Sequence, residues 1–304
     1  MKARLISDGG AAGSDEGNFF RSPPFLEAEG VTHTIEIDGG ALRLPVIVRP
    51  IERSERVDAI SPYGYPGASG RPGSPLDPGE IDWSETGLVS VFVRDRIGEE
   101  CLAGGTVRNH VHIADGDAGI RKRLREQIRR NERHGWSMEA IPGPEAASGQ
   151  RTAFERAYAE TMARTGAAER YLYPSEYFEI LLRSERSWLM AGSREGSGLA
   201  GAIAVASDGY LHYYLGGTAD EALGDSPMKN LFAAMISLGE DLGLPVSLGG
   251  GLESGDSLDS FKRGFATGEA PFRTHELVCD PDAYEELAAR SVPAPEDFFP
   301  AYRS

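Results

Sequence analysis

The chain has 304 residues, of which 40% are hydrophobic and 26% charged, so disordered and fibrous classes are excluded and two ordinary domains fit the length. Its formal net charge of −16 argues against a nucleic-acid partner, because neutralised phosphates supply most non-specific affinity. No apolar stretch reaches the roughly 18 to 20 residues of a membrane span, and no signal-peptide core follows Ile6, so a cytoplasmic protein is expected.

The first part of the chain is predicted to be rich in β-structure. Residues Met1 to Gly17, rich in Gly, Ala, Ser and Asp, are expected to form a frayed start. Thr32 to Ile37 alternates apolar and polar residues, Asp38-Gly39-Gly40 is a turn signal, and Ala41 to Val48 continues as an apolar strand. Together these features predict a β-hairpin. The Gly/Pro-rich loop from Ile60 to Gly79 is longer than most connections, and such loops are often functional.

The middle of the chain predicts a strand, a helix and a linker. Leu88 to Arg94 has the continuous apolar character of a buried strand. From Ile120 to His134, apolar residues such as Leu124 and Ile128 recur at helical spacing, and the opposite face of this helix is basic. The stretch from Ile141 to Gly149 is rich in Pro and Gly, which predicts an interdomain linker.

After this linker the pattern alternates between helices and strands, which predicts an α/β (α+β) fold. The predicted helices are Thr152 to Arg164, Glu176 to Arg183, Ser226 to about Leu242, Asp256 to Arg263 and Pro281 to about Arg290. The predicted strands are Ser187 to Ala191, Leu199 to Ala206, Tyr210 to Leu215, Val246 to Leu248 and His275 to Cys279. The third of these helices is predicted to begin with Ser226 as its N-cap and Pro227 at its first position.

Four short segments of the second half carry a family resemblance. They are Leu211-His212-Tyr213-Tyr214-Leu215-Gly216-Gly217, Ser226-Pro227, Gly249-Gly250-Gly251, and Asp259-Ser260-Phe261-Lys262-Arg263-Gly264-Phe265. With these segments the chain resembles the Fem family of aminoacyl-tRNA-dependent peptidyl transferases. The likeness covers most of the chain and is weakest before Asn18 and through the loop from Tyr63 to Gly79.

The resemblance implies two tandem acetyltransferase-like (GNAT) domains with mixed sheets flanked by helices. Residues 1–145, with a C-terminal tail of about 281–304, would form the first domain. Residues 150–280 would form the second domain, which carries the Phe-Lys motif at Phe261 and Lys262.

The resemblance also implies which donor the reaction uses and which acceptors are possible. Similar proteins build peptidoglycan cross-bridges, and free-standing actinomycete relatives add an amino acid to peptide-like antibiotics such as peptidyl nucleosides. The implied reaction moves Ala, Gly or Ser from charged tRNA, as co-substrate, to the free amine of a small peptide or peptidyl-nucleoside acceptor. No heptad segment long enough for the coiled-coil arm of some cross-bridge enzymes is present, which favours antibiotic biosynthesis over peptidoglycan as the setting.

The chemistry of this transfer needs no metal, no covalent nucleophile and no further cofactor. An aminoacyl ester is already activated, so the enzyme has to position the amine and stabilise the oxyanion. The sequence has no HExxH, GxSxG or P-loop motif. Cys101 and Cys279 are far apart without metal-ligand neighbours, so two free buried thiols are expected.

Lys262 and Phe261 are the catalytic residues that the resemblance implies. Lys262 matches the lysine of the family's Phe-Lys pair and would stabilise the oxyanion. Phe261 would line the reacting ester. By composition alone an exposed surface lysine and a core phenylalanine are the simpler interpretations.

Tyr213 and Arg164 match two substrate-binding residues of similar proteins. Tyr213 would line the acceptor site, with a core tyrosine as the alternative interpretation. Arg164 would bind an acceptor phosphate through a bidentate contact of its guanidinium, and a solvated arginine at a helix end is the alternative. Tyr63 and Tyr65, in the long loop, are further candidates for the acceptor groove, although turn packing explains them equally well.

The basic helix is the candidate contact for the tRNA backbone, because a net-acidic protein can still carry a basic stripe. Its six candidate residues are Arg121, Lys122, Arg123, Arg125, Arg129 and Arg130. A charge-rich helix face that is merely solvated is the alternative. One departure concerns the acceptor: where similar peptidoglycan enzymes have a lysine for a nucleotide-linked precursor, this chain has Phe25-Leu26-Glu27-Ala28-Glu29.

Two other functions stay open at this stage. An acyl-CoA-dependent N-acyltransferase would need backbone amides that hold a pyrophosphate at a helix start, yet the Arg/Gln-x-x-Gly-x-Gly/Ala signal is missing between Gly216 and Asn230, where the acids Asp220, Glu221 and Asp225 occur. A non-catalytic peptide-binding module would keep the groove without the chemistry. The sequence does not identify the amino acid, the acceptor, the oligomeric state or a general base.

Overall fold

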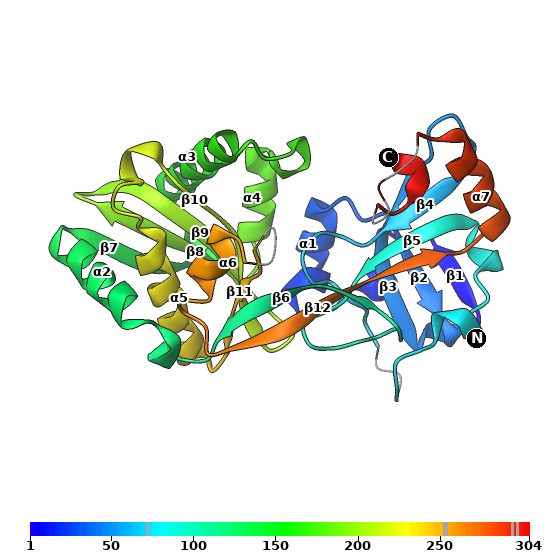
Figure 1. Cartoon of the computed structure of the whole chain (residues 1–304), viewed down its shortest axis with the longest axis horizontal. Coiled ribbons are helices and arrows are strands. Elements are labelled where there is room, and N and C mark those ends of the chain that lie inside the picture. Colours follow the sequence, from blue (N-terminus) through cyan, green and yellow to red (C-terminus); the bar gives the residue numbers. More distant parts are fainter. Residues whose placement is uncertain (71–72, 252–254, 293–294, 296–297) are drawn as a thin grey trace. The chain divides into compact units, whose positions relative to one another are not determined.

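The computed structural model describes residues 1–70, 73–251, 255–292, 295 and 298–304. The chain divides into two compact units, the first formed by Met1–Arg108 with Pro271–Ser304 and the second by Asn109–Ala270 (Figure 1). Two strands, β6 (Thr106–Ala114) and β12 (Gly268–Val278), run across the boundaries between them. No helix in the described part of the chain has the length and apolar character that crossing a membrane requires.

The first unit contains a mostly antiparallel sheet in the order β1-β2-β3-β4-β5-β12, in which β4 and β5 are parallel. Its strands before β12 are β1 (Ala3–Ile6), β2 (His33–Ile37), β3 (Leu42–Pro50), β4 (Val57–Ile60) and β5 (Leu88–Arg94). The helices α1 (Pro23–Ala28) and α7 (Pro281–Arg290) belong to this unit. The predicted hairpin is confirmed, because β2 and β3 pair antiparallel from His33 opposite Val46 to Ile37 opposite Leu42.

The expected frayed start is wrong. Strand β1 pairs antiparallel with β2, from Ala3 opposite Ile37 to Ile6 opposite Thr34. Ala3 is completely buried in the core of the first unit and Leu5 packs against that core. The pairing with β2, which local composition does not reveal, orders this segment.

The second unit contains a sheet in the order β6-β11-β10-β9-β8-β7, in which β10 and β11 are parallel. Its other strands are β7 (Trp136–Pro142), β8 (Ser187–Arg194), β9 (Ser197–Ser207), β10 (Tyr210–Thr218) and β11 (Val246–Gly249). Its helices are α2 (Lys122–Arg133), α3 (Ser148–Thr165), α4 (Ser175–Leu182), α5 (Met228–Leu242) and α6 (Ser257–Lys262). Mixed sheets flanked by helices confirm the predicted α/β class.

The predicted interdomain linker from Ile141 to Gly149 falls inside the second unit. Pro142 is still part of β7 and pairs with Trp188 of β8. Helix α3 begins at Ser148, so the segment only joins two elements of one compact unit. The division into two tandem GNAT-like domains near residues 145–150 stays a prediction.

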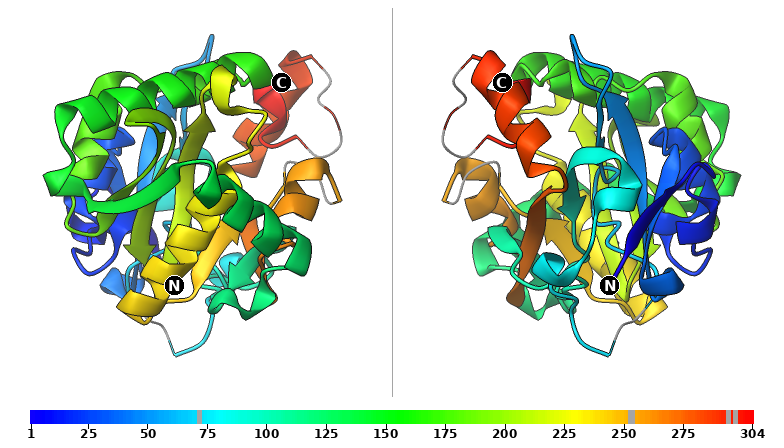
Figure 2. Two further views of the ribbon diagram at one scale, coloured as in Figure 1. Left: turned by 90° about the vertical axis from the view of Figure 1, so that its left-hand side faces the viewer. Right: turned by 90° about the vertical axis from the view of Figure 1, so that its right-hand side faces the viewer.

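Helices α3 and α5 cover opposite faces of the second unit's sheet (Figure 2). On one face, Gly217 of β10 lies so close to the backbone of Ala157 in α3 that a Cβ atom would collide with it. On the other face, the ring of Tyr213 packs edge-on against Phe232 of α5, with centroids 5.0 Å apart. Simple alternation would place residues 213 and 217 on one face, but the register irregularity between Tyr213 and Leu215 shifts the pattern by one residue, so they lie on opposite faces.

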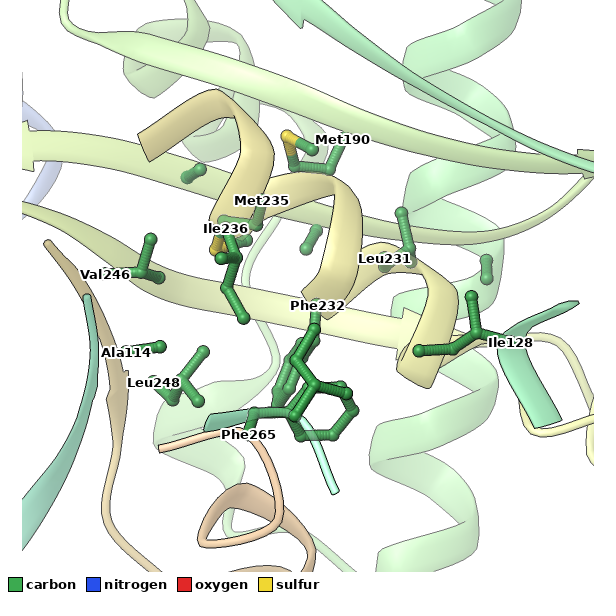
Figure 3. Close-up of a cluster of buried hydrophobic side chains, with 14 of the residues drawn as sticks. Ala114, Ile128, Met190, Leu231, Phe232, Met235, Ile236, Val246, Leu248 and Phe265 are labelled. Atoms are coloured by element: carbon green, nitrogen blue, oxygen red, sulfur yellow. The ribbon is translucent and has the colours of Figure 1, made fainter. Parts of the chain in front are cut away.

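The hydrophobic core of the second unit lies between the sheet and α5. Leu231, Phe232, Met235 and Ile236 of α5 point into it (Figure 3). Each such side chain contributes about 1.5–3 kcal/mol through its burial. Ile128 of α2 belongs to the same core, so the apolar face of the basic helix packs inward and its cationic face is left to solvent.

Helix α5 begins differently from the prediction. Its N-cap residue is Pro227, and Ser226 lies one position earlier with a φ of 50°. The Ser226 side chain therefore does not cap the helix, although the helix ends at Leu242 as expected.

Candidate functional site

The strands β10 and β11 separate at the point where the resemblance places its tyrosine. Their parallel pairing joins Leu211 to Val246 and His212 to Ser247. Strand β10 continues to Thr218 with a register irregularity between Tyr213 and Leu215, whereas β11 ends at Gly249. Tyr213 is thus the first residue of β10 beyond the paired segment, on the face covered by α5.

Lys262 is buried next to Tyr213. It is the last residue of α6, with 5% of its surface exposed, and its Nζ lies 5.5 Å from the centroid of the Tyr213 ring. The Nζ donates a hydrogen bond of 2.7 Å to the carbonyl oxygen of Gly250. Burial lowers the pKa of Lys262 from 10.5 to about 8, against the opposing influence of Asp256 and Asp259. At pH 7 the ammonium form still predominates, so this is a buried cation over an aromatic ring.

Asn109 lies beside the carbonyl group that holds Lys262. A Cβ atom at Gly250 would lie 2.9 Å from Nδ2 of Asn109, so glycine permits the close approach of the two. The Oδ1 atom of Asn109 is buried without a hydrogen-bond partner within the described structure. Buried polar atoms without partners are rare in native proteins. This one lies near the Gly250 carbonyl, which accepts the hydrogen bond from Lys262.

A buried histidine and aspartate fix the helix that carries Lys262. Nε2 of His112, on β6, lies 2.7 Å from Oδ1 of Asp259, and 1% of the His112 side chain is exposed. Asp259 precedes Lys262 by three residues, which is about one turn of α6. The hydrogen bond with His112, followed by the nearby Arg263 guanidinium, holds the pKa of Asp259 below its usual range against the effect of burial.

Further contacts surround this pair. Nδ1 of His112 lies 3.3 Å from Oε1 of Glu269, and Arg263 donates to Asp259 over 2.9 Å. Asp256 caps α6 by accepting from the Asp259 amide over 2.6 Å. Sequence reasoning did not identify His112 or Asp259 as site residues, although Asp259 lies in the motif segment. Only the folded chain brings these two residues together.

Phe261 packs in an aromatic cluster. Its ring centroid lies 5.3 Å from that of Phe232 and 5.4 Å from that of Phe265. These contacts attach α6 to the core of the unit and support the core interpretation. A role for Phe261 in lining an ester stays a prediction.

The structure does not bring Arg164 together with Lys262 and Tyr213. Arg164 is near the end of α3, on the opposite face of the sheet, where its guanidinium forms an ion pair with Asp220. It also donates to Oγ1 of Thr161 over 3.0 Å and to the Thr218 carbonyl over 3.4 Å. A phosphate would have to compete with Asp220 for this side chain.

Tyr63 and Tyr65 belong to the first unit, and they differ from each other. Tyr63 is 37% exposed, and its amide donates to Oε2 of Glu29 over 2.7 Å. Tyr65 packs edge-on against Phe20 and Phe272, with centroids 5.7 and 5.0 Å away, and burial raises the pKa of its hydroxyl. Tyr65 therefore has the surroundings of a packing residue, and Tyr63 keeps a surface position.

Most cations of the basic helix are exposed. Arg125 instead forms an ion pair with Asp117 over 2.6 Å and a hydrogen bond of 3.0 Å to the Ile120 carbonyl. The other five candidates, exposed and without an ion pair within the described residues, are Arg121, Lys122, Arg123, Arg129 and Arg130. These five residues form a surface that a polyanion can reach.

Metal ligands and cysteine thiols are the remaining groups that could carry chemistry in the described part of the chain. There, no group of three or more His, Cys, Asp or Glu side chains is placed to hold a metal ion. Cys101 and Cys279 are free thiols, and burial raises the pKa of Cys279 to about 12.

One comparison with protein families matches part of the second unit. Residues 118–263 match the family model described as an acetyltransferase (GNAT) domain. No curated protein matches the sequence of the chain.

Three solved structures share the fold across most of the chain. L-PGS from Bacillus licheniformis has a TM-score of 0.60 and 15% identity, over 85% of this chain and 87% of that one. The C-terminal domain (DUF2156) of a protein assigned as a lysylphosphatidylglycerol synthetase in Agrobacterium fabrum has a TM-score of 0.58 and 13% identity, over 87% of this chain and 89% of that one. FemX has a TM-score of 0.56 and 11% identity, over 83% of this chain and 89% of that one. The chain therefore has a segment, residues 118–263, that is similar to GNAT domains, and a fold similar to that of FemX and the lysylphosphatidylglycerol synthetase structures.

Proposed function

We propose that this protein is an aminoacyl transferase that moves Ala, Gly or Ser from aminoacyl-tRNA to the free amine of a peptide-type acceptor. The observation that carries the proposal is the buried Lys262 ammonium beside Tyr213, where β10 and β11 separate. The shared fold with structures named FemX and lysylphosphatidylglycerol synthetase supports it, since the latter name describes attachment of an aminoacyl group. The resemblance in the Phe261-Lys262 segment supports the same reaction.

In the proposed reaction the acceptor amine attacks the ester carbonyl of the charged tRNA. A C–N bond forms, the ester C–O bond breaks, and the terminal ribose oxygen leaves and takes up a proton while the amine loses one. Negative charge develops on the carbonyl oxygen between these steps. The Lys262 ammonium has three N–H donors, of which one is bonded to Gly250, so it can donate to this oxygen while it keeps its proton.

His112 and Asp259 have a positioning role in this proposal. The short His112–Asp259 contact attaches α6 to β6 one turn before Lys262. The Gly250 carbonyl fixes the other end of the lysine side chain. A cation held from two sides needs little reorganisation when the oxyanion forms, which is the condition for strong electrostatic catalysis.

The exposed cations of α2 are the proposed contact for the tRNA backbone. Helix α2 lies on the α5 side of the unit, where Asn131 donates to Oδ1 of Asn230 over 2.8 Å. Phosphate contacts of such residues release counterions, so the affinity should fall steeply with salt. The net charge of −16 makes this local surface more important, because the rest of the protein repels tRNA.

For the acceptor we propose a peptide or peptidyl nucleoside, as in antibiotic biosynthesis, with a peptidoglycan precursor as the alternative outcome. The segment Phe25–Glu29 supplies no lysine for a nucleotide-linked precursor, and Phe25 and Leu26 are buried. Arg164, the other expected phosphate ligand, is paired with Asp220. Both observations support an acceptor with fewer phosphate groups.

The second candidate is an acyl-CoA-dependent N-acyltransferase, which the description of the family model favours. Such an enzyme would bind pyrophosphate with free amides at the start of α5. Here the amides of Lys229 and Asn230, in the first turn of α5, donate to the carbonyls of Ser226 and Pro227 over 3.4 and 2.9 Å. We therefore rank this candidate second.

The test supplies both donors to the pure protein. One reaction contains a pool of tRNA charged with labelled amino acids and an amine-bearing peptide extract, and the parallel reaction contains labelled acetyl-CoA. Label that moves from tRNA into the peptide fraction supports the proposal and identifies the amino acid. Transfer from acetyl-CoA alone supports the second candidate. Peptide binding without transfer from either donor indicates a non-catalytic module.

A further inference from the structure

The second unit has a pocket on the face of the sheet away from Lys262. It lies between α3, the segment that follows it, and α4, and its volume is about 510 Å³. Pockets of about 300–1,000 Å³ are the usual size for small-molecule sites. Helix α3 covers the face opposite Tyr213 and Lys262, so this pocket is separate from the proposed transfer site.

Three aromatic side chains form one wall of the pocket. They are Tyr158 of α3, Tyr173, and Phe178 of α4. The rings of Tyr158 and Phe178 meet edge-on with centroids 5.3 Å apart, and those of Tyr173 and Phe178 lie 6.2 Å apart. Tyr158 and Phe178 are 4% and 3% exposed and Tyr173 is half-buried, so Tyr173 supplies most of the accessible ring surface of this cluster.

The two tyrosines of this wall are held in place. The Tyr158 hydroxyl donates to the Tyr171 carbonyl over 2.9 Å. Tyr173 stacks on Tyr177 with centroids 4.0 Å apart and an interplanar angle of 7°. Because the rings are already fixed, a ligand loses little binding energy to ordering them.

Glu155 is the one charged residue among those that line the pocket. Its Oε2 accepts a hydrogen bond of 2.5 Å from Oγ of Ser175, which orients the carboxylate. The remaining lining is small or apolar and includes Ala159, Met162, Ala163 and Leu172. Leu172 is 57% exposed, so an apolar surface is open to solvent here.

We propose that this pocket binds an organic ammonium ion attached to an apolar group. A carboxylate beside a partly exposed aromatic ring attracts a cation and repels an anion. The ammonium would lie near Glu155 and the ring of Tyr173, and the apolar group would pack on Met162 and Leu172. Nothing in the proposed transfer reaction requires this pocket, so the two proposals stand independently.

The experiment compares three ligands of nearly equal shape with the whole chain. Phenethylamine carries the cation, 2-phenylethanol is its neutral counterpart, and phenylacetate is the anion. Isothermal titration calorimetry should give an affinity for the amine at least about tenfold higher than for the alcohol, and no binding of phenylacetate. Equal binding of all three, or no binding of the amine at millimolar concentration, overturns the proposal.

Two variants and one control variant locate the binding site. Glu155→Gln should lower the affinity for the amine about tenfold and leave the affinity for the alcohol unchanged, because it removes the charge and keeps the shape of the side chain. Ala163→Phe should abolish binding of both by filling the pocket, and since Ala163 is exposed on α3 the fold should tolerate it. Lys262→Met, on the other face, should bind the amine normally. Amine binding that survives Ala163→Phe, or that Lys262→Met removes, contradicts this location.

Discussion

The two faces of the second unit's sheet have opposite chemistry. On the face of α5 and α6, a buried cation, Lys262, is held beside Tyr213 by Gly250 and supported by an aspartate. On the face of α3 and α4, fixed aromatic rings and one carboxylate, Glu155, line the same pocket. The first arrangement can stabilise developing negative charge, and the second favours a positive ligand.

Neighbouring residues of β10 show how one strand serves both faces. Tyr213 lies against Lys262 and Phe232, whereas the hydroxyl of Tyr214 lies 2.8 Å from that of Tyr177 in α4. Tyr177 in turn stacks on Tyr173 of the pocket. Alternation along the strand therefore separates the two sites by the thickness of the sheet, and a substitution on one face should leave the other face working.

The largest expected effect comes from removing the cation of the first face. Lys262→Met should lower kcat/KM for aminoacyl transfer by about 10²–10³-fold, as for loss of one oxyanion donor. The matched control is Lys229→Met, because Lys229 is also buried, with 9% exposed, and its pKa is also lowered by burial. Steady-state kinetics on both variants measures the difference. An unaltered rate in Lys262→Met removes the lysine from the mechanism.

A smaller effect is expected from the residue that positions α6. Asp259→Ala should lower kcat about tenfold with little change in KM, because a misplaced oxyanion donor weakens the transition state more than the bound substrate. Loss of the His112 partner should also cost about 1–3 kcal/mol of unfolding free energy. Asp259→Asn, which keeps a hydrogen-bond acceptor, should have a higher kcat and a higher free energy of unfolding than Asp259→Ala. A merely structural role would lower the melting temperature and leave kcat of the folded enzyme unchanged.

Charge reversal on α2 tests whether tRNA approaches the α5 side. The double variant Arg129→Glu/Arg130→Glu should weaken tRNA binding and reduce the slope of log affinity against log salt by roughly 1.4–1.8, since about 0.7–0.9 is lost per phosphate contact. Arg183→Glu, at an exposed arginine after α4, is the control. Filter binding at several salt concentrations provides both quantities. The same slope in all three proteins would rule out this helix as the contact.

The titration of Lys262 gives a pH signature of the first face. Because its folded pKa of about 8 lies below the ordinary 10.5, the unfolded state binds more protons between these values, so the free energy of unfolding should rise with pH from about 8 to 10.5. Lys262→Met should lack this rise. The stabilising ammonium is lost over the same range, so kcat should fall above pH about 8. Chemical denaturation and kcat measured across this range test both directions, and a wild-type stability that is flat there contradicts the buried lysine.

The smallest effect is expected at the tyrosine that points to the other face. Tyr214→Phe removes the hydroxyl that contacts Tyr177 and should cost about 0.5–1.5 kcal/mol of unfolding free energy. Aminoacyl transfer should stay within about twofold of wild type, because Tyr213 and Lys262 are on the opposite face. A loss of transfer comparable to that of Lys262→Met would show that the two faces are not independent.

Local patterns were sufficient to predict much of the fold. Strand β5 and helix α7 have the bounds that the sequence predicts, Leu88–Arg94 and Pro281–Arg290, because an apolar run and a Pro-initiated helix are visible locally. Strands β1, β4, β6 and β7 were missed. Strand β1 depends on its pairing with β2, and much of β6 is exposed and polar, so neither has a clear period of its own.

The candidate site was less predictable. The resemblance selected Lys262 and Tyr213, which the structure brings together, and also Arg164, which the structure places on the other face. The pairing of His112 with Asp259 joins residues 147 positions apart, so no local pattern signals it. The pocket beside α3 depends likewise on how the segment after the helix folds back onto it, which helical periodicity does not specify.

The central claim is tested most directly by the mass of the product. One reaction combines the pure protein with an amine-bearing peptide, charged tRNA and acetyl-CoA. The mass of the peptide product is then measured by mass spectrometry. The account predicts an increase of one Ala, Gly or Ser residue that depends on charged tRNA and is lost in Lys262→Met. An increase of one acetyl group instead, or an aminoacyl increase that Lys262→Met retains, would contradict it.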